Sequence, residues 1–260
     1  MMANYKDWID AIDIKVDYFS AFMKAWIAFN AWYESSEVEG KTDKEKIDYI
    51  SSKTNRFRTY LSNLLIEQTV EGNSYRENVA QLHASLLGAA ITTQAFVGVR
   101  QTISFSEIAV KDQNNRSQTE YYSLRYQCLR AAGKLTTTIV NKTNNVEVFK
   151  LEQEEYDEEA IKQQASFAVL TYTQKSKCLD MYKQLFPYLI ESVLDTSETA
   201  IKMGAYSFVN DADKVSGAIV KILYSLRCAL AHGDISPDTH SNSVYRYAYE
   251  VLVPPLKKLK

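Results

Sequence analysis

An arginine and a histidine near the C-terminal end of the chain have the types and spacing for acid–base chemistry on a phosphodiester. Four residues separate Arg227 from His232 within Leu226–Gly233, LRCALAHG. A guanidinium can hold a phosphate through two hydrogen bonds and stabilise developing negative charge. An imidazole can take a proton from a 2′-hydroxyl or return one to a leaving oxygen. The pair therefore predicts cleavage of RNA without a metal ion.

The helix that carries these two residues decides whether they can act together. The pattern predicts that this helix ends near Gly233, because glycine commonly follows a helix C-terminus. Five steps along a helix turn by roughly 140°, so Arg227 and His232 do not share one face. They converge only if the helix ends near His232 or if a second copy supplies the complementary half. We therefore expect a homodimer. The apolar face of this helix comprises Val215, Ile219, Ile222, Leu223, Leu226 and Leu230.

Two further residues are candidates for supporting roles. Asn30 lies among aromatic residues and, if buried, needs polar partners. It either braces the Arg227 region or forms a structural hydrogen bond. Asp234 follows the motif and either orients His232 or caps the turn. No histidines, cysteines or carboxylates stand at metal-ligand spacing, so the sequence predicts neither a metal site nor a cofactor.

The elements that position these residues are predicted to be mainly helical. Only 8 Gly and 4 Pro occur in 260 residues, which favours long helices. Residues 3–35 lack both types and carry aromatic residues at spacings of three and four, which predicts a helix with one buried face. That face comprises Phe19, Phe22, Trp26, Phe29 and Tyr33. Further helices are expected over about 43–67, 74–87, 174–193, 198–210 and 241–253, with a capping box at Ser74 and Glu77 and a stop at Pro254.

The middle of the chain has a different pattern. Residues 111–119 are polar and predict a loop. β-Branched residues over 134–140 and alternating residues over 146–151 predict a β-hairpin with a loop of about five residues. We interpret about 100–165 as an insertion within a single helical domain, 1–260, and not as an independent fold.

Composition and charge limit the function. The formal net charge is −2, so contact with nucleic acid must be local. The three cysteines stand far apart without a CxxC pair, which disfavours disulfides and zinc and favours a reducing cytoplasm. The first residues carry Asp7, Asp10 and Asp13 and do not form a signal peptide. No apolar run is long enough to span a membrane.

Two stretches resemble the HEPN domains (higher eukaryotes and prokaryotes nucleotide-binding). Residues 222–234, ILYSLRCALAHGD, resemble their R-x4-6-H signature, and residues 26–33, WIAFNAWY, resemble the first core helix of several bacterial subfamilies. The resemblance implies a HEPN-like helical bundle that dimerises through the motif helix. It also implies endoribonuclease activity in which Arg227 and His232 are catalytic. Such domains occur in toxin–antitoxin and anti-phage systems, so RNA and a possible antitoxin or other regulatory protein are the implied partners.

The sequence leaves two alternatives open. The residue after the motif arginine is commonly polar in these domains, whereas Cys228 stands here. Some HEPN domains do not cleave and only bind nucleotides, RNA or proteins, and the net charge of −2 fits such a module. The other alternative is a structural helical protein whose aromatic face docks onto a larger assembly.

Overall fold

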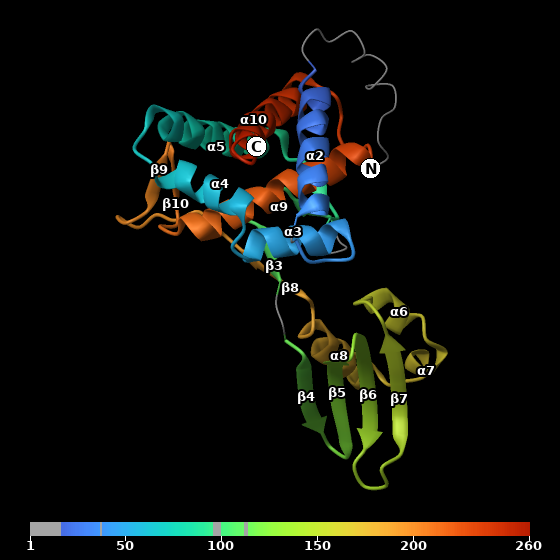
Figure 1. The fold of residues 1–260 in the computed structure, drawn as a ribbon. Helices are drawn as coiled ribbons and strands as arrows, with labels where there is room; N and C mark the ends of the chain where they lie inside the picture. The colour runs from blue at the N-terminus through green and yellow to red at the C-terminus, as the bar shows by residue number, and fades with distance from the viewer. Residues whose placement is uncertain (1–16, 37, 96–99, 112–113) are drawn as a thin grey trace. The chain divides into compact units, whose positions relative to one another are not determined.

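The computed structural model describes residues 17–36, 38–95, 100–111 and 114–260. The chain divides into two compact units, which we call the helical unit (Met1–Ala109 with Ile190–Lys260) and the sheet unit (Val110–Leu189) (Figure 1). About half of the structure is helical and about a fifth lies in strands. The expectation of a mainly α HEPN-like bundle with one small hairpin is therefore wrong, because the fold is mixed α and β.

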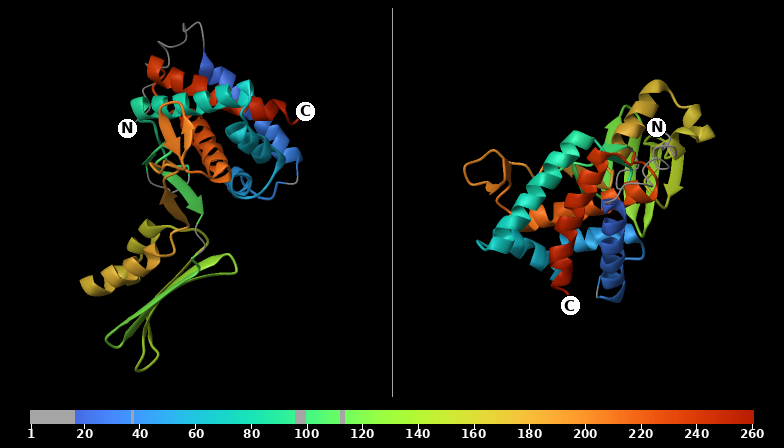
Figure 2. Two further views of the ribbon diagram at one scale, coloured as in Figure 1. Left: turned by 90° about the vertical axis from the view of Figure 1, so that its left-hand side faces the viewer. Right: turned by 90° about the horizontal axis from the view of Figure 1, so that it is seen from above.

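The helical unit is built around helix α9, Ala212–Ala231. This helix contacts α2 (Tyr18–Ser35), α3 (Asp43–Ser52) and α4 (Arg56–Ile66). Helix α10 (Thr239–Lys257) also contacts α9, and it lies along both α2 and α5 (Val70–Ala89) (Figures 1 and 2). Short antiparallel strand pairs complete the unit: β1 (Thr92–Thr93) with β2 (Gln101–Thr102), and β9 (Ile201–Met203) with β10 (Tyr206–Phe208). Among the described residues, no helix combines the length and apolarity needed to cross a membrane.

The aromatic face of α2 forms part of the core, as its spacing predicts. Phe29 is only 1% exposed and lies at the centre of a ring cluster. Its ring centroid lies 4.4 Å from that of Phe57 and 5.2 Å from that of Trp26. Tyr33 packs edge-on against it at 5.4 Å. Residues 3–16 of the predicted helix, and the acidic residues used to exclude a signal peptide, lie outside the described residues.

Two predicted helix boundaries in the first half of the helical unit are wrong. The single helix expected over 43–67 is divided into α3 and α4, because Asn55 caps α4 and its amide also donates to the Ile50 carbonyl at 2.9 Å. The expected turn and capping box at residues 72–77 lie inside α5, which Thr69 caps instead. Gly72 is needed there for close packing, because a Cβ would lie 2.4 Å from the Glu67 carbonyl oxygen.

Three more predictions in the C-terminal part are corrected. Residues 198–210 do not form a helix: they contain the β9–β10 hairpin, in which Gly204 has a φ of 54°. The helix expected over 174–193 ends at Lys183, and Tyr188–Glu191 form strand β8, which pairs with β3 (Ile108–Lys111). Helix α10 continues through Pro254 and Pro255 to Lys257: the fixed φ of proline matches a helix, and each proline costs one backbone hydrogen bond without ending it.

The sheet unit contains a four-stranded antiparallel sheet in the order β4-β5-β6-β7. Helices α6 (Glu158–Lys162), α7 (Ala165–Ala168) and α8 (Tyr172–Lys183) cover one face (Figure 2). The hairpin predicted within 134–151 is confirmed as β6 and β7, but it supplies only two of the four strands. The prediction of a polar loop over 111–119 is wrong from Arg116 onward, where strand β4 begins. The strands are β4 (Arg116–Tyr121), β5 (Leu124–Ala131), β6 (Lys134–Asn141) and β7 (Glu147–Gln153).

All three cysteines are buried and free. Cys128 and Cys178 belong to the sheet unit, and Cys228 belongs to the helical unit. Burial raises the pKa of Cys128 to about 11 and that of Cys178 to about 12. The sheet-unit thiols therefore stay protonated in the folded protein, which suits a packing role and not a nucleophilic one.

His83 is buried in the helical unit, and we expect its titration to make the stability of the protein depend on pH. Its ring centroid lies 4.4 Å from that of Tyr206 and 5.6 Å from that of Phe105, and its Nδ1 has no hydrogen-bond partner among the described residues. Burial lowers the pKa of His83 below its ordinary value. The unfolded chain takes up a proton as the pH falls through about 6.5, whereas the folded chain resists protonation.

We therefore expect the contribution of His83 to be present above pH 6.5 and to be lost as the pH falls from there through the lowered pKa of the folded protein. Urea unfolding at pH 8 and pH 5 would measure the loss, and His83→Leu should make it smaller. His240→Gln removes an exposed histidine and serves as the control. An equal loss in the wild-type protein and His83→Leu would contradict this role.

Candidate functional site

The C-terminal end of α9 places Arg227 and His232 at the surface of the helical unit, where Arg227 is half-buried and His232 is exposed. Helix α9 ends at Ala231 with His232 as its C-cap, whose backbone N–H donates to the Cys228 carbonyl at 3.0 Å. Gly233 follows with a φ of 68°, which is the left-handed conformation that stops a helix. The predicted helix end near Gly233 is confirmed.

Helix α9 is held firmly along its length. Gly217 allows close contact with α3, because a Cβ there would lie 2.4 Å from the Ser51 carbonyl oxygen. Lys221 and Asp48 form a buried ion pair, with Nζ 3.4 Å from Oδ1. Near the motif, the buried Tyr245 hydroxyl donates to the Leu226 carbonyl at 2.7 Å. The backbone next to Arg227 is therefore fixed by neighbouring helices.

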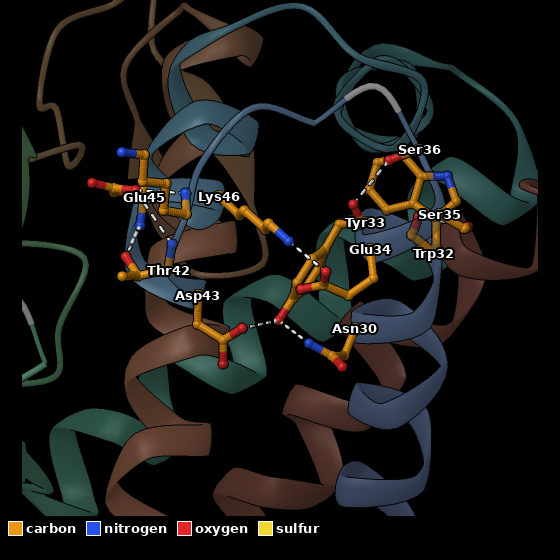
Figure 3. Close-up of polar contacts among 11 residues, drawn as sticks. Asn30, Trp32, Tyr33, Glu34, Ser35, Ser36, Thr42, Asp43, Glu45 and Lys46 are labelled. Carbon is orange, nitrogen blue, oxygen red and sulfur yellow. Dashed lines mark hydrogen bonds and ion pairs between the residues drawn. The ribbon is translucent and has the colours of Figure 1, made fainter.

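A chain of polar contacts fixes the Arg227 side chain. Its Nη2 lies 3.3 Å from Oδ2 of Asp43, the first residue of α3. The other carboxylate oxygen accepts a hydrogen bond from the Tyr33 hydroxyl at 3.1 Å. That hydroxyl in turn accepts a hydrogen bond from the Asn30 amide, and Figure 3 shows Asn30, Tyr33 and Asp43 in line (Figure 3). We call these four residues the Arg227 network.

Asp43 is positioned by the capping box that begins α3. The Thr42 hydroxyl accepts from the Glu45 backbone N–H, and the Glu45 carboxylate accepts from the Thr42 backbone N–H. Next to it, Lys46 pairs with Glu34 across α3 and α2 (Figure 3). The start of α3 is thereby anchored where Asp43 meets Arg227.

The Arg227 network keeps a fixed positive charge that is still open to solvent. The side chain of Arg227 is 29% exposed. Burial opposes its charged form, but Cys228 and Asp43 outweigh burial and raise the pKa of Arg227. Burial raises the pKa of Tyr33 to about 12, so its hydroxyl remains a donor to Asp43 at neutral pH. The buried Nε of Arg227 has no hydrogen-bond partner among the described residues.

No hydrogen bond or ion pair joins His232 to the Arg227 network within the described part of the chain. The His232 side chain is exposed, and within the described part of the chain its ring makes no hydrogen bond or ion pair. Asp234 pairs with Arg100 at 3.4 Å, and its backbone N–H donates to the Ala229 carbonyl at 2.9 Å. The structure thus joins Asn30 to Arg227 through Tyr33 and Asp43, and it joins Asp234 to Arg100.

Tyr33 and Asp43 are site residues that the sequence patterns do not predict. Tyr33 was assigned only to the buried face of α2, although it lies three positions after Asn30 and shares its side of the helix. The Thr42–Glu45 capping pattern predicts that a helix starts at Asp43, but it does not predict that Asp43 pairs with Arg227. Their meeting with Arg227 depends on the packing of α3 against α9.

No cluster of three or more metal-ligating side chains occurs within residues 17–36, 38–95, 100–111 and 114–260. The polar groups at the site are instead one cation, one carboxylate, one phenol and one amide. In comparisons with known proteins, no family model, no curated protein and no solved structure matches the chain.

Proposed function

We propose that this protein is a metal-independent endoribonuclease of the bacterial defence or toxin–antitoxin type, acting as a homodimer. One observation carries the proposal: the C-terminal end of α9 presents an anchored, charged Arg227, and its C-cap His232 is exposed and makes no hydrogen bond or ion pair with the described residues. This combination suits phosphate binding by the first residue and proton transfer by the second. The resemblance of residues 222–234 to the HEPN signature supports the same assignment.

The proposed reaction is attack of an RNA 2′-hydroxyl on its own phosphate. His232 takes the hydroxyl proton as the O2′–P bond forms, and Arg227 stabilises the added negative charge on the phosphate oxygens. The P–O5′ bond then breaks, and the leaving oxygen receives a proton from an imidazolium. The products are a 2′,3′-cyclic phosphate and a 5′-hydroxyl. Two His232 side chains across a dimer can divide the base and acid roles.

The homodimer is part of the proposal because Arg227 and His232 do not share one face of a helix, and a second copy can supply the complementary half. A two-fold axis beside the end of α9 would bring four such groups together, two from each copy. Asp43 and the Cys228 sulfur, which accepts from Nη1 at 3.9 Å, would hold each guanidinium in a fixed direction, and the terminal N–H groups that they do not use would face phosphate. Asn30 and Tyr33 would act as positioning residues through Asp43.

A second candidate is a non-catalytic module that binds nucleotide, RNA or protein. The Asp43–Arg227 ion pair favours it, because a guanidinium held by a carboxylate at 3.3 Å can stabilise the fold without taking part in chemistry. Cys228 after the motif arginine also distinguishes this chain from the commoner pattern. We propose a cytoplasmic location for either function, with an antitoxin or other regulatory protein as a possible partner.

The test uses the pure full-length protein and an end-labelled RNA in excess EDTA. We expect cleavage products that end in 2′,3′-cyclic phosphate and 5′-hydroxyl, and a dimer by sedimentation. Product formation that needs an added metal ion would refute the mechanism. RNA retained by the protein without any product would select the non-catalytic module.

A further inference from the structure

A cavity of about 560 Å³ lies in the helical unit beside α2, α3 and the start of α4. Its volume is in the range of sites for small organic ligands. We call it the Trp32 cavity. The residues that line it are Trp32, Ser35, Ser36, Val38, Tyr49, Thr54, Asn55 and Arg56.

The aromatic wall of the Trp32 cavity is rigid. The Trp32 ring stacks on Phe29, with centroids 5.7 Å apart and planes at 15°, and it also contacts Phe57 at 5.8 Å. Trp32 is nevertheless only half-buried, and Tyr49 on α3 is half-buried as well. Two partly exposed rings in one cavity offer apolar faces on which a planar ligand can stack.

Among the described residues that line the cavity, Arg56 alone carries a charge. Arg56 is exposed, and its guanidinium makes no hydrogen bond or ion pair with the described part of the chain. An arginine without a carboxylate partner at an aromatic cavity favours a ligand that carries an anion beside a planar ring. The neighbouring Asn55 amide is already used, since it donates to the Ile50 and Lys53 carbonyls.

We infer that the Trp32 cavity binds a nucleotide, with the base against Trp32 and Tyr49 and the phosphate on Arg56. The nucleotide can be free or part of an RNA strand, because both present the same base and phosphate.

The Trp32 cavity is separated from the Arg227 network along α3. Tyr49 lies six residues after Asp43 on α3, which is about 9 Å along the helix axis. Trp32 directly precedes Tyr33, but Figure 3 shows the two rings on different sides of α2 (Figure 3). The cavity is therefore a site separate from the Arg227 network, and its occupancy does not require cleavage.

Binding is tested with the full-length protein carrying His232→Ala, so that failure of the proposed cleavage does not affect the result. Calorimetric titration would compare adenosine 5′-monophosphate, adenosine and inorganic phosphate. We expect the mononucleotide to bind more tightly than either fragment. Arg56→Gln should weaken it about tenfold or more, the effect of losing one charged hydrogen bond. Lys53→Gln makes the same charge change at an exposed residue outside the cavity lining and should leave the affinity unchanged.

A second variant and a second ligand complete the test. Tyr49→Leu should also weaken mononucleotide binding while leaving the Trp32 stack on Phe29 in place. A 2′-O-methyl RNA decamer resists 2′-hydroxyl attack and reports binding alone. If the mononucleotide displaces this RNA, the cavity binds a nucleotide that is part of an RNA strand. If the mononucleotide binds and the RNA does not, the ligand is a free nucleotide. No binding of either at millimolar concentration, or equal weakening by Arg56→Gln and Lys53→Gln, would overturn the inference.

Discussion

Replacing His232 by alanine is expected to lower the rate of RNA cleavage by about 100-fold or more, the usual contribution of a general acid–base residue. The side chain is exposed and makes no hydrogen bond or ion pair with the described residues, so the variant should fold normally. Single-turnover cleavage of a labelled RNA in EDTA would measure the rate, and circular dichroism would check folding. A loss of rate with unchanged folding assigns the effect to chemistry.

The matched control for this prediction is His240→Ala. His240 is also exposed and follows on the next helix, α10, so the substitution removes the same chemical group from a different place. We expect the His240→Ala protein to cleave as fast as the wild type. If the His232→Ala protein also kept the wild-type rate, the assignment of His232 would be wrong.

Replacing Phe29 by alanine is expected to lower the free energy of unfolding by about 3–5 kcal/mol, the typical cost of removing a buried aromatic ring. The Phe29 ring contacts Trp26, Trp32, Tyr33 and Phe57, so no single neighbour can fill the space. The change should also weaken the Arg227 network, because Tyr33 packs against the lost ring. Chemical denaturation followed by far-ultraviolet circular dichroism would measure the loss.

Ile27→Ala is the control for the Phe29 prediction. Ile27 lies on the same helix but is 63% exposed, and surface substitutions usually change stability by less than about 0.5 kcal/mol. Phe29→Leu, which keeps more of the buried volume, should cost less than Phe29→Ala. Equal losses for Ile27→Ala and Phe29→Ala would show that the aromatic cluster does not determine stability.

The helices whose apolar residues recur at three and four could be predicted from the sequence. The stripe from Phe19 to Tyr33 and the face of α9 from Val215 to Leu226 are buried as expected, because both patterns persist over several turns. Boundaries were predicted less well. The break at Asn55 and the inclusion of Gly72 in α5 depend on side-chain capping and backbone contacts from outside the local pattern.

The strands of the sheet unit were harder to predict. In β4, only Ser117 is fully buried, and polar residues such as Gln118 and Glu120 occupy the exposed face. Such a strand resembles a polar loop when only composition is considered. Its partner β5 and the register Ser117–Cys128 are determined by pairing across the sheet, which one sequence does not display. The hairpin β6–β7 was found because its alternation and turn are local.

At the site, too, residues within one short segment could be predicted, whereas contacts between distant segments could not. Arg227 and His232 could be named because both lie in one short segment at a helix end. Asp43 could not be assigned to Arg227, because the two residues are 184 positions apart and meet only through helix packing. The roles of Arg227 and His232 as catalytic residues stay predictions.

The buried cysteines make the opening of each unit separately measurable. An alkylating reagent reacts with a thiolate that it can reach, so a buried thiol is labelled only when the structure around it opens. Cys128 and Cys178 would report on the sheet unit and Cys228 on the end of α9. Labelling rates followed by mass spectrometry therefore distinguish transient opening of the sheet from fraying beside Arg227, without any added probe.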